Sequence, residues 1–293
     1  EIAYAHHLKK DTKEALRIVE GLVKKSGATE RIFQMLGNLY DDQGNAEKAL
    51  ETYDAGLTKF PKSGPLHLEK GNVYWNKKDM DKAVPFYEKG IEVNPAFSSN
   101  YYRSARAYMG SKEKVWGIMY GEIFMNLERG SKRTQEMSEL LYKTYQRSIS
   151  FNSEASVGVN FCQQVFAVKE TDKAKKNIEL PFCNLYETNM LLSVISSKAI
   201  DIDELSKIRS LFIENYFKMS GGNPKPNILF EYQKNLQKLG HLDAYNHWLL
   251  MKGDEDGFDK WHKANPERWN AFVEWFTKNP LQIDSAHKFL REP

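Results

Sequence analysis

The sequence predicts an all-α fold: an α-solenoid of antiparallel helix pairs, continued or capped by further helices towards the C-terminus. Three observations predict it. A 34-residue period runs through the first third of the chain, apolar residues recur at three- and four-residue spacing in the rest, and no apolar run exceeds four residues. Spacing of three and four residues places apolar side chains on one face of a helix.

The composition argues against disorder, membrane insertion and nucleic-acid binding. The 293 residues include 42 Lys and Arg against 39 Asp and Glu, and 41% are hydrophobic. This apolar content is enough to build a core. A membrane-spanning helix needs about 20 consecutive apolar residues, so no transmembrane segment is predicted. The net charge of +3 is not gathered into a basic block, which argues against a nucleic-acid partner.

Small, aromatic and proline residues carry the 34-residue period. Shifting the chain by 34 residues aligns Gly37 with Gly71, Tyr40 with Tyr74, Ala49 with Ala83, Tyr53 with Tyr87, Gly56 with Gly90 and Pro61 with Pro95. We expect the small residues to lie where two helices cross closely, because bulk there would hold the helix axes apart. The tyrosine rings would fill the space beside each crossing and leave a hydroxyl for a partner. Each proline follows a helix that it cannot continue.

These residues resemble the tetratricopeptide repeat, a 34-residue helix–turn–helix unit. Residues 30–63 match its pattern at Phe33, Leu36, Gly37, Tyr40, Ala49, Tyr53, Gly56 and Pro61. Residues 64–97 match it from Gly71 onward, with His67 and Lys70 departing from the pattern. The same register predicts a partial repeat over 1–29 and a degraded repeat over 98–130, so that repeats cover residues 1–130.

Beyond residue 130 the period is lost, and residues 131–293 predict a helical C-terminal region. Helices are expected over 134–149, 180–196, 203–219, 227–239, 242–251, 256–263 and 266–277, with a short one near 285–290. Residues 151–156 are a polar break, residues 157–168 fit a strand or a helix, and 220–226 form the clearest loop. We expect these helices to cap the solenoid, because its apolar ends must be shielded from water. A separate helical domain is the alternative.

No motif for catalysis, metal binding or a cofactor is present, and we predict none of the three. His241 and His247 are six residues apart, and no H-E-x-x-H sequence occurs. The acidic residues at 254–259 resemble a calcium loop, but Phe258 and Asn265 stand at two of its ligand positions. These acidic residues are therefore expected to cap the next helix.

Cys162 and Cys183 do not form a C-x-x-C pair. We expect two buried thiols, since free cysteine is usually buried and inert, and a disulfide between them is the alternative. The chain begins at Glu1 without a methionine, which favours an exported or cell-envelope protein whose leader has been removed.

The resemblance implies a binding groove, because side chains at positions 2, 5, 9 and 12 of each first helix line the concave surface of tetratricopeptide repeats. Transferred to this sequence, the groove includes Gln34, Asn38, Asp41, Leu68, Asn72, Trp75, Tyr102 and Arg106. Asn38 and Asn72 repeat at position 9, where an amide can both donate to and accept from an extended peptide. A solvent-facing helix stripe would also be polar, so composition alone does not decide between the two interpretations.

One subfamily of these repeats clamps a C-terminal carboxylate, and this chain departs from its pattern. Gln34 and Glu69 replace a required lysine and asparagine, and Glu69 would repel a carboxylate. The sequence instead predicts a non-catalytic scaffold that binds a protein or peptide in the groove.

Two other functions compete with the scaffold. One is an enzyme whose site lies in the C-terminal half, which a cluster of acidic or histidine side chains in a deep pocket would favour. The other is a carbohydrate-binding envelope protein that uses the aromatic residues Phe258, Trp261, Trp269, Phe272, Trp275 and Phe276. We expect these aromatic residues to form a helix–helix core instead, because Trp269, Phe272 and Phe276 follow one helix face.

Overall fold

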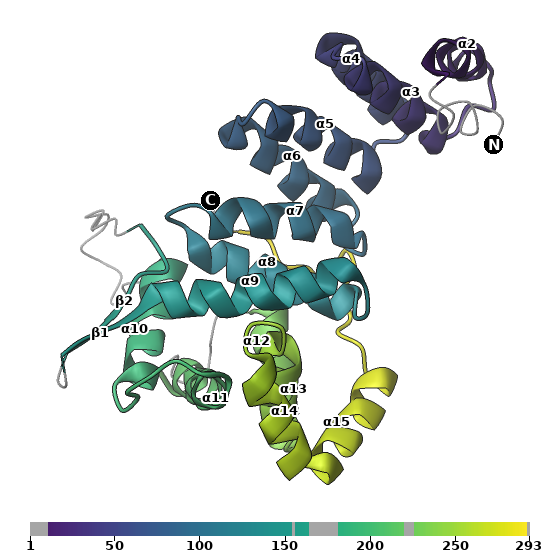
Figure 1. Cartoon of the computed structure of the whole chain (residues 1–293). Coiled ribbons are helices and arrows are strands. Elements are labelled where there is room, and N and C mark those ends of the chain that lie inside the picture. The colour runs from purple at the N-terminus through teal and green to yellow at the C-terminus, as the bar shows by residue number, and fades with distance from the viewer. Residues whose placement is uncertain (1–10, 154–155, 164–180, 220–225, 292–293) are drawn as a thin grey trace, which may run out of the picture. The chain divides into compact units, whose positions relative to one another are not determined.

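The computed structural model describes residues 11–153, 156–163, 181–219 and 226–291 (Figure 1). Apart from one hairpin, the elements in these ranges are α-helices, which confirms the predicted class. The contacts divide the chain into two compact units, residues 1–104 with 283–290 and residues 105–282 with 291–293. The domain boundary at residue 130 stays a prediction.

The first unit is a series of helix pairs. It contains α2 (Thr12–Val23), α3 (Glu30–Asp42), α4 (Ala46–Lys59), α5 (Gly64–Asn76), α6 (Met80–Val93) and the first part of α7 (Ser98–Met109). α3 packs against α4 and α5 against α6, and α3 also contacts α5. α2 lies where the second helix of the partial repeat is predicted, whereas its expected first helix, residues 1–8, lies outside the described residues.

Within each pair, a tyrosine ring on the second helix lies over a glycine on the first and lets the two helices approach closely. A Cβ atom on Gly37 would lie 2.1 Å from Cε1 of Tyr53, and one on Gly71 would lie 2.2 Å from Cε1 of Tyr87. Carbon atoms do not pack at such distances, so each ring fills the space that a side chain would need. Tyr53 and Tyr87 are almost wholly buried. The predicted close crossings are confirmed.

The turns inside both pairs also repeat after 34 residues. Gly44 has a φ of 77°, and Lys78, at the equivalent place in the second pair, has a φ of 60°. This left-handed conformation favours glycine, and a lysine there is strained. The helices that follow begin in the same way, with Asn45 and Asp79 accepting a hydrogen bond from the backbone N–H three residues on. Packing of the pair therefore imposes the turn geometry on a residue that does not favour it.

The second unit contains the end of α7, the remaining helices and a hairpin. These are α8 (Lys114–Leu127), α9 (Lys132–Ser148), β1 (Ile149–Ser153), β2 (Ser156–Val159), α10 (Phe182–Val194), α11 (Ile202–Met219), α12 (Ile228–Lys238), α13 (Leu242–Leu250), α14 (Glu255–Ala264) and α15 (Pro266–Lys278). α8 is buried without interruption from Val115 to Asn126. A helix that is buried on all sides belongs in a core, so α8 is part of the core of this unit.

Two local expectations for this half of the sequence are wrong. The predicted polar break at 151–156 overlaps the hairpin, in which Phe151 pairs with Val157 in antiparallel register. The helix expected near 285–290 does not form. Asp284 accepts hydrogen bonds from the backbone N–H groups of Ala286 and His287, a local pattern that competes with a helix. The predicted loop at 220–226 lies outside the described residues except for its last position.

Cys162 and Cys183 form a disulfide, which corrects the expectation of two buried thiols. The backbone N–H groups of Phe161 and Cys162 both donate to Oε1 of Glu187, at 2.7 and 2.9 Å. The cysteines are 21 residues apart, and closing a loop of that length stabilises a fold by about 3 kcal/mol.

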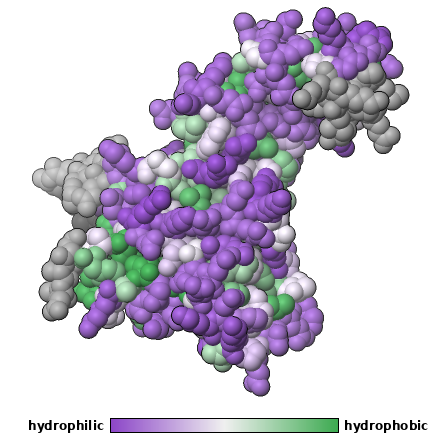
Figure 2. All heavy atoms as spheres, viewed as in Figure 1, coloured by the Kyte–Doolittle hydropathy of each residue, from purple (hydrophilic) through white to green (hydrophobic). Residues whose placement is uncertain are grey.

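Of the six aromatic residues near the C-terminus, three pack in the core as predicted, and Phe258, Trp269 and Trp275 are half-buried. Phe272 and Phe276 on α15 are 0% and 6% exposed, and Trp261 on α14 is 8% exposed. Large apolar side chains that remain exposed concentrate on α10 and directly after it, at Leu191, Leu192 and Ile195. Figure 2 shows hydrophobic atoms gathered over α10, whereas the visible surface of α2–α6 is mainly hydrophilic.

Replacing Gly37 by alanine should destabilise the α3–α4 pair by about 1–3 kcal/mol, because the new methyl group requires the Tyr53 ring to move within a packed core. Gly21→Ala on α2 is the matched control. Nothing lies within 4 Å of its Cβ position, and alanine in a helix should add about 0.5–1 kcal/mol of stability. Hydrogen exchange of peptides from α3 and α4 would measure the local effect. Unchanged exchange in Gly37→Ala would show that the ring does not constrain this position.

Candidate functional site

The first helices of the two repeats share one polar surface, which we call the first-helix face. It consists of Gln34, Asn38, Asp41, Glu69, Asn72 and Asn76. Two hydrogen bonds join α3 to α5 across it: Nε2 of Gln34 donates to Oε1 of Glu69 at 2.8 Å, and Nδ2 of Asn76 donates to Oδ2 of Asp41 at 3.3 Å. Two of the predicted residues, Gln34 and Asp41, are thus linked across the helices to Glu69 and Asn76, which were not predicted.

The two asparagines of this face are oriented by the tyrosines that lie over the glycines. The Tyr53 hydroxyl donates to Oδ1 of Asn38 at 2.6 Å, and the Tyr87 hydroxyl donates to Oδ1 of Asn72 at 3.2 Å. The sequence separation is 15 residues in both pairs. Each amide therefore uses a lone pair of its oxygen inside the repeat, and its Nδ2 is left to donate elsewhere. Nδ2 of Asn72 donates to Oε2 of Glu69 at 2.8 Å.

Two carboxylates of the face have only neutral partners. Among the described residues, Glu69 accepts hydrogen bonds from two amides and Asp41 from one, and neither forms an ion pair. Lys70, next to Glu69 in the chain, pairs instead with Asp54 at 2.5 Å. Burial raises the pKa of Tyr53, and the negative charges of Glu69 and Asp41 raise it further. The hydroxyl therefore stays protonated and donates to Asn38.

The remaining predicted groove residues are more buried than a solvent-facing stripe requires. Leu68 is 9% exposed and packs in a core cluster with Ala83 and Tyr87. Tyr102 is 7% exposed. Trp75 is half-buried rather than exposed, and the guanidinium of Arg103 lies 5.4 Å from its ring centroid.

Arg106 is exposed and belongs to the second unit, so the structure does not place it on the first-helix face. The sequence indicates Glu69 only as an obstacle to a carboxylate clamp, yet in the structure it receives hydrogen bonds from both repeats. Its position one residue after the predicted groove position 68 is the signal that could have identified it. Participation of any of these residues in binding stays a prediction.

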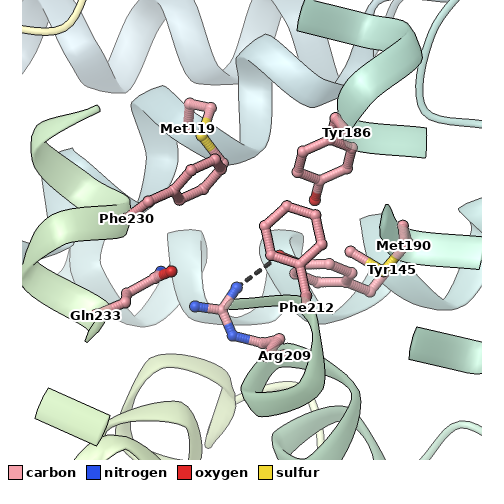
Figure 3. Close-up of a pocket in the computed structure, with 8 residues that line it drawn as sticks. All are labelled: Met119, Tyr145, Tyr186, Met190, Arg209, Phe212, Phe230 and Gln233. Carbon is pink, nitrogen blue, oxygen red and sulfur yellow. Dashed lines mark hydrogen bonds between the residues drawn. The ribbon is translucent and has the colours of Figure 1, made fainter. Parts of the chain in front are cut away.

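The second unit has a buried polar centre built on Arg209 and Glu122. Glu122 on α8 is 0% exposed and Arg209 on α11 is 5% exposed. Nη2 of Arg209 lies 2.8 and 2.9 Å from the two carboxylate oxygens of Glu122. Nη1 of Arg209 donates to the Tyr145 hydroxyl at 2.5 Å (Figure 3). Gln233 and Tyr245 also donate to Glu122. Every charge here is compensated within the unit, as a stable buried ion pair requires.

A small cavity lies beside this centre. It is lined by Met119, Tyr145, Tyr186, Met190, Arg209, Phe212, Phe230 and Gln233 (Figure 3). Its volume of ≈ 10 Å³ has room for about one water molecule. No lining residue is a carboxylate, a histidine or a thiol, and burial raises the pKa of Tyr186 well above its ordinary value. The convergent titratable groups that would favour an enzyme do not meet in this cavity.

His247 on α13 is a second buried polar group. It is 1% exposed, and its ring stacks on Trp261 with centroids 4.1 Å apart. Nδ1 lies 2.8 Å from the backbone oxygen of Asp243, and Nε2 lies 3.0 Å from Oδ1 of Asp203. Both neighbours are acceptors, so the ring bonds to both only as an imidazolium.

The pKa values of this cluster agree with that charge state. Burial lowers the pKa of His247, but hydrogen bonds to Asp243 and Asp203 outweigh burial and raise it above its ordinary value. Burial also raises the pKa of Asp243, and the hydrogen bonds from His247 and Ser206 outweigh this and lower it to about 2. The cluster therefore joins α11 to α13 through a charged histidine.

The described residues give little support to a calcium loop, another metal site, a carbohydrate-binding surface or a membrane-spanning helix. Asp254 accepts from the backbone N–H of Gly257 at 3.0 Å, which confirms that the acidic turn caps α14. Ligand atoms of Glu113, Cys162 and Cys183 lie within 4.8 Å of one another, but the two sulfurs are bonded together and offer no thiolate. Trp269 meets Phe258 edge-on at 5.3 Å, so this ring is used in packing. No helix of the described ranges is long and apolar enough to cross a membrane.

The family profile described as the tetratricopeptide repeat matches residues 30–58 and 65–97. The chain contains tetratricopeptide repeats. The matched ranges correspond to the α3–α4 and α5–α6 pairs, so the first-helix face is formed by the first helix of each repeat. Tetratricopeptide repeats indicate protein partners and a protein-interaction scaffold.

Solved structures of MamA are similar to part of the chain. One crystal structure has a TM-score of 0.42 at 18% identity and covers 50% of this chain and 84% of MamA. A second MamA structure, AMB-1, has a TM-score of 0.39 at 18% identity, with coverages of 50% and 78%. No curated protein matches the chain.

We expect the second unit to lose stability as the pH rises through the raised pKa of His247. The charged ring contributes stability that is fully present below its unfolded pKa of about 6.5 and is lost above its folded pKa. His247→Gln should therefore be less stable than wild type at pH 5.5, and the difference in unfolding free energy should shrink towards pH 8.5. Urea unfolding at both pH values measures it. Asp203→Asn should shrink the pH effect, and a pH-independent difference would contradict the charged cluster.

Proposed function

We propose that this chain is a non-catalytic scaffold whose tetratricopeptide repeats bind an extended peptide segment on the first-helix face. The observation that carries the proposal is the repeated asparagine–tyrosine pair. In both repeats a buried hydroxyl fixes the amide of a first-helix asparagine, at Asn38 and at Asn72. A fixed amide loses little conformational freedom when it binds, so its hydrogen bonds contribute more to affinity.

The surroundings support recognition of a peptide backbone. An extended peptide needs polar groups along a strip, and hydrogen bonds between α3 and α5 make the strip continuous. The remaining donor of Asn38, its Nδ2, suits a backbone carbonyl of the partner. In the described part of the second unit, the buried carboxylate and guanidinium are already compensated by each other, which favours a structural role over catalysis.

Peptides selected by the full chain from a phage-displayed library of random decapeptides should lose affinity when Asn38 is replaced by alanine. Loss of one hydrogen bond predicts a change of about 2- to 12-fold in Kd, measured by fluorescence anisotropy. Tyr53→Phe is the matched control, because it breaks the same internal hydrogen bond but leaves the amide on the face. Both variants should be destabilised by about 1 kcal/mol, and Tyr53→Phe should lose less affinity than Asn38→Ala, because its amide is still present but is no longer fixed. Equal affinities of Asn38→Ala and wild type would contradict the proposal.

We infer further that the protein matures in an oxidising compartment, as expected for an exported or cell-envelope protein. The Cys162–Cys183 disulfide supports this, because disulfides persist in such compartments and are rare in the cytosol. Protein isolated from its native source and denatured without reductant should not react with iodoacetamide at either cysteine. Treatment with a reductant should then expose both to alkylation. Alkylation of both cysteines before reduction would contradict the proposal.

A further inference from the structure

We infer that the partner places a cationic side chain, lysine or arginine, on the first-helix face between α3 and α5. The inference rests on the proposed function and names the chemistry of its partner. Amides and carboxylates of both repeats contribute to the hydrogen-bonding capacity of this face.

Three of the four side-chain amides of the face already donate to its two carboxylates. Nε2 of Gln34 and Nδ2 of Asn72 both donate to Glu69, and Nδ2 of Asn76 donates to Asp41. Each carboxylate oxygen has a second lone pair, so Glu69 and Asp41 can still accept. These two carboxylates therefore remain open to a further donor, and no ion pair of the described residues neutralises them. Lysine and arginine carry three and five N–H donors and no acceptor.

The charges on and beside the first-helix face also favour a cationic partner. Lys70 is turned away from Glu69, because its Nζ pairs with Asp54 on α4 and lies 4.6 Å from the ring centroid of Phe86 on α6. The lysine adjacent to Glu69 in the sequence thus stabilises the second helices instead. A hydrogen bond between ionised groups is about twice as strong as one between neutral groups. An acidic segment would meet repulsion at both carboxylates, so charge complementarity selects a basic partner.

The amides would also hold Glu69 in place for such a cation. Its two oxygens are bonded to side chains from different helices, Gln34 on α3 and Asn72 on α5, so the carboxylate is fixed from both sides. Asn72 is itself fixed by the Tyr87 hydroxyl. A chain of hydrogen bonds therefore runs from the buried tyrosine to the carboxylate that would meet the partner.

Two synthetic probes test the inference on the full chain. One is a fluorescein-labelled decapeptide of glycine and serine with three lysines, and the other carries glutamates in place of the lysines. We expect the lysine peptide to bind more tightly than the glutamate peptide by at least about tenfold, and to weaken when NaCl is raised from 50 to 300 mM, since screening reduces exposed charge interactions.

Glu69→Gln removes the charge at constant size and should weaken binding of the lysine peptide about tenfold, a loss close to that of one hydrogen bond to a charged group. Asp41→Asn gives a second variant if Glu69→Gln does not fold. Glu51→Gln on α4 is the matched control, because Glu51 is an exposed glutamate on a second helix. It should bind like wild type. Equal binding of the two probes, or no effect of Glu69→Gln and Asp41→Asn, would overturn the inference.

The library-selected peptides separate this inference from the proposed function. They should be rich in lysine and arginine and should lose affinity in both Asn38→Ala and Glu69→Gln. If they lose affinity only in Asn38→Ala, the first-helix face is the binding site but its partner is not basic. If neither substitution changes their affinity, or if no peptide is selected, both proposals fail.

Discussion

The structure of the repeats depends on a tyrosine ring that occupies the space left by a glycine. This contact sets how closely the two helices of a pair approach, because the ring lies where a Cβ atom on Gly37 or Gly71 would be. It also carries the tyrosine hydroxyl through the pair to the asparagine that follows the glycine. The same contact therefore packs the core of each repeat and orients an amide on its surface. A repeat in which the tyrosine stays packed also keeps its asparagine in this orientation.

Such a contact is visible in the sequence because both partners recur at a fixed spacing, so the helix pairs and the core tyrosines could be predicted. The left-handed conformation of Lys78 could not be predicted from its residue type, because packing imposes it. In the second unit, interactions join positions without a repeated pattern. Arg209 and Glu122 are 87 residues apart, and spacing could not decide whether Cys162 and Cys183 are bonded.

The candidate site was predictable in position but not in exposure. Transferring repeat positions identified Gln34, Asn38, Asp41 and Asn72, whose side chains the structure brings together. The same rule placed Leu68 and Trp75 on the surface, although Leu68 packs in the core and Trp75 is half-buried beside Arg103. The position of a residue on a helix gives the direction of its side chain, but it does not show whether a neighbouring residue covers that side chain. The role of Glu69 depends on Gln34, 35 residues earlier in another repeat, so no local pattern contains it.

The buried carboxylate of Glu122 in the second unit is neutralised by an ion pair, whereas Glu69 and Asp41 on the first-helix face have no such pair among the described residues. This difference bears on binding. Glu122 is fully buried, and Arg209, Gln233 and Tyr245 all donate to it, because an unpaired buried charge costs several kcal/mol. Glu69 and Asp41 are only half-buried and need no such compensation while water reaches them. A segment that covered the first-helix face would remove that water. The covered carboxylates would then require a cation for the same reason that Glu122 requires Arg209, so the specificity of the face would arise from desolvation at the moment of binding.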